Sequence, residues 1–232
     1  MKTSILLLPG LLCDAALWAH QVEALSTQYD CVVADMTQDD SLGGMASRAI
    51  AAMSEQFSVA GLSMGGYCAL EIMKQVPDRV TRLALLDTSA RADATGRLDI
   101  RRELIKHVRS GNFETVIAKH FQKFVHPSRL NDTEIMSIIR ASAMNVGPEA
   151  YMRQQAAIMK RPDSLELLSD IKCPTLVLCG AEDALTPPPL HDEMAAEIPG
   201  AVLVKIPNSG HLPTLEQPAL VNAALAKWME RT

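Results

Sequence analysis

The sequence predicts an α/β domain built on a parallel sheet and interrupted by a run of helices. Over the first 87 residues, short apolar runs alternate with amphipathic segments, a pattern typical of parallel strands joined by helices. Between residues 88 and 172 no strand pattern is found, and from residue 173 the alternation resumes. We therefore expect a core formed by residues 1–87 and 173–232, interrupted by a helical insertion formed by residues 88–172, which is called the cap below.

The core elements follow from short apolar runs that end at turn or capping residues. Asp14 is expected to cap a helix that carries Trp18, and Ser41 to cap a second helix that carries Met45. A third helix is expected to end near Val76. Helices are also expected around residues 190–198 and from Pro218 onward. The expected strands are residues 4–8, 31–34, 58–60, 80–86, 175–179 and 201–206.

The cap is expected to hold five helical segments separated by Gly and Pro residues. Gly147 and Pro148 separate the third segment from the fourth. The expected segments are residues 98–109, 113–125, 132–145, 149–160 and 164–169.

Length and composition exclude several classes of protein. The chain has 232 residues, 48% of them hydrophobic, and a net charge of −5. This length suits one domain with an insertion, and the apolar content argues against intrinsic disorder. A negative net charge without a basic block argues against nucleic-acid binding. No apolar run approaches the roughly 18 residues of a membrane span.

The N-terminal segment and the cysteines bear on localisation. The start of the chain imitates a secretory signal, but Pro9 and Gly10 break its apolar run, and bulky Leu12 lies where a cleavage site needs a small residue. The five cysteines form no C-x-x-C pair, so neither a zinc site nor a disulfide framework is expected. We expect a cytoplasmic protein with reduced thiols.

The strongest functional signal is the G-x-S-x-G pattern at residues 61–65, which lies between an expected strand and an expected helix. A serine on such a turn adopts a strained backbone, and its hydroxyl projects from the sheet. The glycines allow strand and helix to approach closely. A chance glycine-rich turn would give the same letters, so the strand–turn–helix context carries the interpretation.

A nucleophilic serine needs a base, and the base needs an acid that orients it. Five of the six histidines lie within or beside expected helices, where solvation or packing explains them. His211 instead lies in a loop after the last expected strand, where parallel sheets gather their sites. Asp183, after the fifth strand, is the candidate acid, and Asp87, after the fourth, is its rival. The order Ser63, Asp183, His211 is that of one hydrolase fold.

On these motifs the sequence resembles the α/β-hydrolase superfamily, and small capped serine esterases within it, along nearly its whole length. One departure is Pro9-Gly10 where many members have His-Gly, which keeps the backbone donor but changes the side chain. The serine nucleophile argues against dehalogenases and epoxide hydrolases, which present aspartate. The matching segments are residues 8–11, 61–66, 180–183 with 185–187, and 210–211 with 216–218.

The resemblance implies a role for each candidate residue. Ser63 is implied as nucleophile, His211 as base and Asp183 as orienting acid, with the backbone N–H groups of Leu11 and Met64 forming the oxyanion hole. It also implies about six strands, all parallel, with the first two strands of larger members absent. The cap is implied to lie over the site, between the fourth and fifth strands.

The neighbours of these positions predict a pocket for an apolar acyl group. Leucines flank the motif residues, and methionines recur at near-helical spacing in the cap, where ordinary packing would also explain them. The candidate pocket residues are Leu12, Leu185, Leu212, Met136, Met144 and Met159.

We therefore expect a serine hydrolase that cleaves a carboxylic ester through an acyl-enzyme, with no metal and no organic cofactor. A thioesterase, a lactonase, a carbon–carbon bond hydrolase and a perhydrolase would use the same triad, and a low-turnover ligand receptor the same fold. The expected partner is a small-molecule ester. An acidic carrier protein is an alternative, because Arg102, Lys106 and Arg109 share one helical face, although a solvated face explains them without a partner.

Overall fold

The computed structural model describes residues 2–231, and within them it places six parallel strands in one sheet. The order across the sheet is β2-β1-β3-β4-β5-β6, so the expectation of six parallel strands is confirmed. The strands are β1 (Ser4–Leu8), β2 (Asp30–Val33), β3 (Phe57–Leu62), β4 (Val80–Leu86), β5 (Thr175–Gly180) and β6 (Val202–Ile206).

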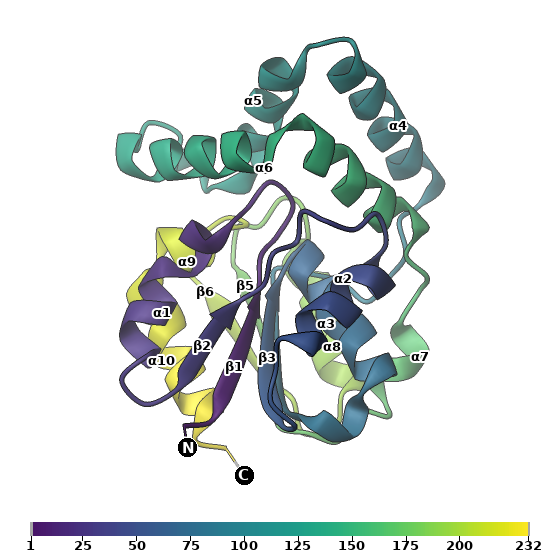
Figure 1. Cartoon of the computed structure of the whole chain (residues 1–232). Coiled ribbons are helices and arrows are strands. Elements are labelled where there is room, and N and C mark those ends of the chain that lie inside the picture. The colour runs from purple at the N-terminus through teal and green to yellow at the C-terminus, as the bar shows by residue number, and fades with distance from the viewer. Residues whose placement is uncertain (1, 232) are drawn as a thin grey trace.

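The central strands are buried on both faces, as a parallel sheet between two helical layers requires. Every residue of β1, β3 and β5 is buried, whereas the edge strands β2 and β6 are partly exposed. Helices α1 (Ala19–Leu25) and α10 (Pro218–Met229) lie on one face of the sheet (Figure 1). Helices α2 (Leu42–Ala51), α3 (Met64–Gln75) and α8 (Pro188–Glu197) lie on the other.

The strand order places a crevice at one edge of the sheet. From β1 the chain moves outward to β2 and then returns past β1 to β3. Ligands of open α/β sheets bind at such a switch point, beyond the carboxyl ends of the strands. Leu8 pairs with Gly61, and Leu62 pairs with Leu86. The loops that follow β1, β3 and β4 therefore meet at the same edge.

The cap lies over this edge (Figure 1). Its long helix α6 is bent at Gly147, whose φ is 73°, and Pro148 follows. The backbone of Gly147 is not helical (ψ 170°), so α6 consists of two helical stretches that meet at a kink, as the sequence predicts, and Pro148 begins the second stretch. The helices over the edge are α4 (Thr95–Arg109), α5 (Phe113–Phe124) and α6 (Thr133–Lys160), whereas α7 (Leu165–Leu168) packs against α8.

The short elements differ most from the expectation. Asp14 does cap a helical segment, because its side chain accepts a hydrogen bond from the Ala16 N–H, but that segment is a 3-10 turn (Ala15–Trp18) that precedes α1. Helix α9 (Pro213–Glu216) is not expected from the sequence, since four residues are too few to show a periodic pattern. Two further 3-10 turns are Pro77–Arg79 and Pro127–Arg129. Within residues 2–231, no helix combines the length and the apolar character needed to cross a membrane.

Candidate active site

Ser63 lies on the sharp turn between β3 and α3. Its backbone has φ 57° and ψ −115°, a strained conformation for a residue with a side chain. Hydrogen bonds to the Ser63 backbone hold the turn. The Ser63 N–H donates to the Leu86 carbonyl at 2.9 Å, and its carbonyl accepts from the Gly66 N–H at 2.9 Å and from the Thr88 hydroxyl at 2.8 Å. The surrounding structure therefore fixes the direction in which the hydroxyl points.

Two glycines make this turn possible. A Cβ atom on Gly61 would lie 2.2 Å from the carbonyl oxygen of Gly65, and one on Gly65 would lie 2.0 Å from that of Leu8. Both distances are well inside van der Waals contact. The prediction that glycines permit strand and helix to approach is thus confirmed at both positions.

His211 is buried, with 3% of its surface exposed. Its Nδ1 lies 2.8 Å from Asp183 Oδ2, and its backbone N–H donates to the carbonyl of Phe124 at 3.0 Å. The Phe124 ring packs near the imidazole, with ring centroids 6.1 Å apart. Since Nδ1 donates to a carboxylate, the neutral ring leaves Nε2 unprotonated and able to accept a proton.

Asp183 is equally buried, and several hydrogen bonds hold its carboxylate. Oδ1 accepts from the backbone N–H groups of Leu185 at 2.8 Å and Thr186 at 3.1 Å, and Oδ2 accepts from the Thr186 hydroxyl at 2.6 Å. Burial alone would raise the pKa of Asp183, but the charge and hydrogen bond of His211, together with these donors, lower it to about 2. Asp183 is therefore ionised at neutral pH.

The rival acid, Asp87, lies close to the same pair. It is fully buried, and its Oδ1 accepts from the Gly180 N–H at 2.8 Å, whereas Oδ2 has no partner within residues 2–231. Burial, and next the charge of Asp183, raise the pKa of Asp87 well above its usual range. The structure brings both acids to His211, and the hydrogen bond to Nδ1 comes from Asp183.

These three side chains are also the one group of described residues whose ligand atoms would suit a metal ion, since those atoms lie within 4.8 Å of one another. Their chemistry does not favour a cation. Both oxygens of Asp183 already accept hydrogen bonds, and the raised pKa of Asp87 favours a neutral carboxyl group. Hard cations require ionised oxygen ligands that are free to coordinate.

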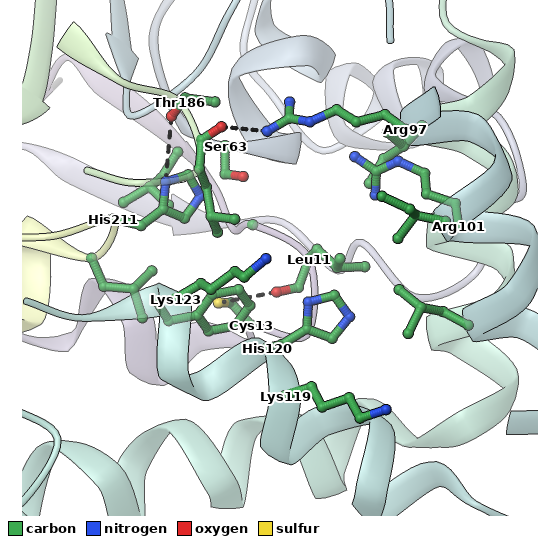
Figure 2. A pocket seen from close by; sticks show the side chains of 18 of the residues that line it. Leu11, Cys13, Ser63, Arg97, Arg101, Lys119, His120, Lys123, Thr186 and His211 are labelled. Carbon is green, nitrogen blue, oxygen red and sulfur yellow. Dashed lines mark hydrogen bonds between the residues drawn. The ribbon is translucent and has the colours of Figure 1, made fainter. Parts of the chain in front are cut away.

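Ser63 and His211 line one cavity of about 450 Å³ between the core and the cap (Figure 2). The Ser63 hydroxyl makes no hydrogen bond within the described chain; such bonds are often long before a substrate binds and shorten in the complex. Much of the cavity lining is apolar. Its apolar residues include Leu11, Leu62, Phe124, Ile158, Leu185 and Leu212.

Two backbone N–H groups beside Ser63 have no acceptor within residues 2–231. They belong to Met64, the first residue of α3, and to Leu11, in the loop after β1. Leu11 also lines the cavity. An N–H group without an acceptor can donate to an anion, and the position of Met64 at a helix N-terminus further favours negative charge there.

A family model described as "Alpha/beta hydrolase family" matches residues 5–224. The chain belongs to this family. A thermophilic esterase from Thermogutta terrifontis, solved with malate bound, has a TM-score of 0.90 and 30% identity over 99% of this chain and 90% of its own. A pimeloyl-[acyl-carrier protein] methyl ester esterase of Nitrosomonas europaea is 26% identical over 92% of this chain and 90% of its length. A Mycobacterium tuberculosis protein that bears the name of a putative non-heme bromoperoxidase is 26% identical over 90% of this chain and 86% of its own length. The family and the esterase relatives identify a hydrolase, while the names differ in substrate.

Four of the pocket residues expected from the sequence do not line the cavity of this hydrolase, and that expectation is corrected. Leu12 is buried in the core with φ 62°, Met144 is 47% exposed on α6, and Met136 and Met159 are half-buried outside the lining. The physical reason is the orientation of the cap. It turns α4 and α5 toward the cavity, and Ile158 is the α6 residue that reaches it within the described chain.

Glu216 is a buried residue whose role the sequence does not predict. Its Oε1 accepts from the N–H groups of Gly210 at 2.9 Å and Leu212 at 3.3 Å, and its Oε2 accepts from the His126 N–H at 2.7 Å. Burial raises the pKa of Glu216 despite these donors. The side chain therefore fixes the loop on both sides of His211 and joins it to the cap. The only sequence signal was the family match at residues 216–218, which names no function for the carboxylate.

Proposed function

We propose that this hydrolase is a serine esterase that cleaves a carboxylic ester with an apolar acyl portion through an acyl-enzyme. One observation carries the proposal. Ser63, on its strained turn, shares a cavity with His211, whose Nδ1 lies 2.8 Å from the ionised carboxylate of Asp183. The names of two relatives, an esterase and a methyl ester esterase, support an ester as substrate.

Acylation begins when the Ser63 oxygen attacks the ester carbonyl carbon and its proton passes to Nε2 of His211. The carboxylate of Asp183 stabilises the imidazolium that results. The N–H groups of Leu11 and Met64 donate to the oxyanion. As the tetrahedral intermediate collapses, the C–O bond to the alcohol breaks, and the imidazolium protonates the leaving oxygen.

Deacylation repeats these steps with water as the nucleophile. His211 takes a proton from a water molecule, which attacks the acyl carbonyl, and Ser63 leaves with that proton restored to its oxygen. The neutral state favoured for Asp87 supports this scheme, because a second buried carboxylate would compete for the Nδ1 proton. The ionised Asp183 alone then sets the tautomer of His211.

The apolar part of the cavity lining supports an apolar acyl portion. Each methylene that the substrate buries there gains roughly 0.8 kcal/mol, which is about a fourfold rise in kcat/KM if the transition state retains the contact. In a series of 4-nitrophenyl esters from acetyl to decanoyl, we expect kcat/KM to rise with chain length until the cavity is full.

The test of the proposal is rapid-mixing kinetics with a 4-nitrophenyl ester. An acyl-enzyme that forms faster than it breaks down gives a burst of 4-nitrophenol that matches the enzyme concentration. We expect this burst in the parent, none in Ser63→Ala, and an unchanged burst in Ser47→Ala, a control on the exposed face of α2. Turnover that survives in Ser63→Ala would contradict the proposal, as would a parent that binds esters without turning them over.

A further inference from the structure

The charged residues that line the cavity are all cations, and all belong to the cap. Arg97 and Arg101 lie on α4, and Lys119 and Lys123 lie on α5 (Figure 2). Each pair is spaced i, i+4, so each shares one face of its helix. Within residues 2–231 no Asp or Glu lines the cavity.

Hydrogen bonds to neighbouring side chains hold the guanidinium group of Arg101 in place. Only 16% of its side chain is exposed, its Nε donates to Asp93 at 2.5 Å, and its Nη1 donates to the Gln155 side chain at 2.7 Å. Its Nη2 has no partner in the described chain. Asp93 also pairs with buried Arg161 at 2.8 Å. One carboxylate therefore serves two guanidinium groups, and one positive charge is left over.

The other cavity cations lack acidic partners. Arg97 donates to the backbone carbonyl of Leu185 at 2.5 Å, which is a neutral acceptor. Within residues 2–231, Lys119 and Lys123 form no ion pair, and both are exposed. His120 adds no charge at neutral pH, because burial, aided by the charges of Arg101 and Lys123, lowers its pKa to about 4.

The outer face of the same helix is different. Arg102 pairs with Asp99 at 2.6 Å, and Lys106 pairs with Glu103 at 2.6 Å. Two of the three cations considered for an acidic carrier protein are therefore compensated locally. Arg97 and Arg101, which together lack a full set of acidic partners, lie on the cavity side of α4, where walls of one sign concentrate the field and attract oppositely charged substrates.

We infer that the cavity takes an ester that also carries a carboxylate, held by Arg101 in the field of Arg97, Lys119 and Lys123 while the ester carbonyl lies at Ser63. The guanidinium group suits a carboxylate because its N–H donors form short, charge-assisted hydrogen bonds. The inference rests on the proposed function for the position of the ester. It replaces the uncharged acyl group expected from the sequence with an apolar chain that ends in, or is joined to, an anionic group.

The first test compares esters that differ only in charge. Mono-4-nitrophenyl adipate carries a carboxylate on the acyl side, and its terminal amide is the neutral match. 4-Acetoxybenzoate carries a carboxylate on the leaving group, and 4-acetoxybenzamide is its match. We expect kcat/KM to favour the anion by about ten- to a hundredfold in at least one pair, and the preference to shrink at high salt. The pair that responds shows which half of the substrate faces the cap.

Variants then assign the preference to the cavity. Arg101→Gln should bring the ratio of the two kcat/KM values toward one, and so should the double variant Arg97→Gln/Lys123→Gln. The double variant changes only exposed side chains and is expected to fold. It therefore tests the charge preference even if Arg101→Gln fails to fold. The control is Arg102→Gln, which removes the same charge one residue along α4 but outside the cavity, and should keep the ratio.

A binding measurement separates this inference from the proposed function. Calorimetry of adipate with Ser63→Ala should show binding that the added Arg97→Gln/Lys123→Gln changes weaken. If both ester pairs react equally in a Ser63-dependent manner and adipate does not bind, the substrate inference is wrong and the serine esterase stands. If adipate binds but turnover does not depend on Ser63, the proposed function is wrong and the anion site stands.

Discussion

The buried side chain of Gln154, in the cap, accepts a hydrogen bond from the backbone N–H of Leu12 at 3.1 Å. Its Nε2 donates to the carbonyl of Met36 at 3.2 Å. Leu12 has φ 62° and directly follows Leu11, whose N–H we propose as a donor to the oxyanion. One cap side chain is thus bonded to the backbone next to this proposed donor.

Replacing Gln154 with Met keeps the volume but removes the acceptor for the Leu12 N–H. Leaving that buried donor unpaired costs about 1–3 kcal/mol, and the loop is expected to relax away from the oxyanion position. We expect kcat to fall by about tenfold or more with a smaller change in KM. The control is Gln21→Met, since Gln21 is equally buried but lies in α1 and bonds to Thr214 and Asn222. Equal loss of stability with loss of kcat in both variants would show that Gln154 acts on folding alone.

The two acids near His211 should respond differently to the loss of charge. Asp183→Asn removes the carboxylate that accepts from Nδ1, so kcat should fall by orders of magnitude, about 10⁴-fold in a comparable triad. Asp87→Asn replaces a carboxyl group that already favours the neutral form, and should cost far less. Steady-state kinetics of both variants measures the ranking. The reverse ranking would assign the orienting role to Asp87.

Asp87 and Asp183 should each make the free energy of unfolding depend on pH, and the two dependences should have opposite signs. The raised pKa of Asp87 means that the folded state keeps a proton that the unfolded chain loses above about pH 4. Its contribution is therefore present at low pH and lost as pH rises through the raised pKa. The pKa of Asp183, lowered to about 2, gives a contribution present above about pH 4 and lost as pH falls toward 2.

Urea unfolding of the parent and of Asp87→Asn at pH 4, 6 and 8 checks this sign. The free energy of unfolding of the variant, relative to the parent, should increase from pH 4 to pH 8. A difference that is constant across this range would mean that Asp87 titrates alike in the folded and unfolded states.

Glu216→Gln tests whether the Glu216 carboxylate holds the loop that carries His211, which is called the base loop here. An amide can keep only one of the acceptor oxygens, so at least one of the N–H groups of Gly210, Leu212 and His126 loses its partner. We expect a loss of roughly 1–3 kcal/mol in the free energy of unfolding, and a drop in kcat because His211 is less well held. Thermal unfolding and kcat are the measurements. Glu182→Gln is the control, because Glu182 accepts from the Ser209 N–H of the same loop but does not join that loop to the cap.

Much of the core and the candidate triad could be predicted because their causes are local in sequence. Short apolar runs predict buried strands, and Gly61 and Gly65 are dictated by backbone contacts within one turn. The G-x-S-x-G motif and the loops of Asp183 and His211 follow strands directly. A parallel sheet brings such loops to one edge whatever the details of packing.

The cavity could not be predicted in the same way. The spacing of Arg97 and Arg101 shows that they share a helical face, but not that this face is turned toward Ser63, since long-range packing sets the orientation of α4. The same limit explains Met144, which the periodic pattern placed in the pocket and which the structure leaves on the surface. The protonation state of Asp87 could not be predicted either, because its pKa depends on burial and on Asp183, which is far away in the sequence.

Covalent labelling of Ser63 tests the central claim most directly. The parent and Ser63→Ala are treated with diethyl 4-nitrophenyl phosphate, and the modified peptide is identified by mass spectrometry. We predict one diethylphosphoryl group per chain, on the peptide that contains Ser63, with loss of esterase activity in proportion to labelling and no label on the Ala variant. Labelling of Ser63→Ala at the same rate, or full activity in a parent labelled at Ser63, would contradict the assignment of Ser63 as the nucleophile.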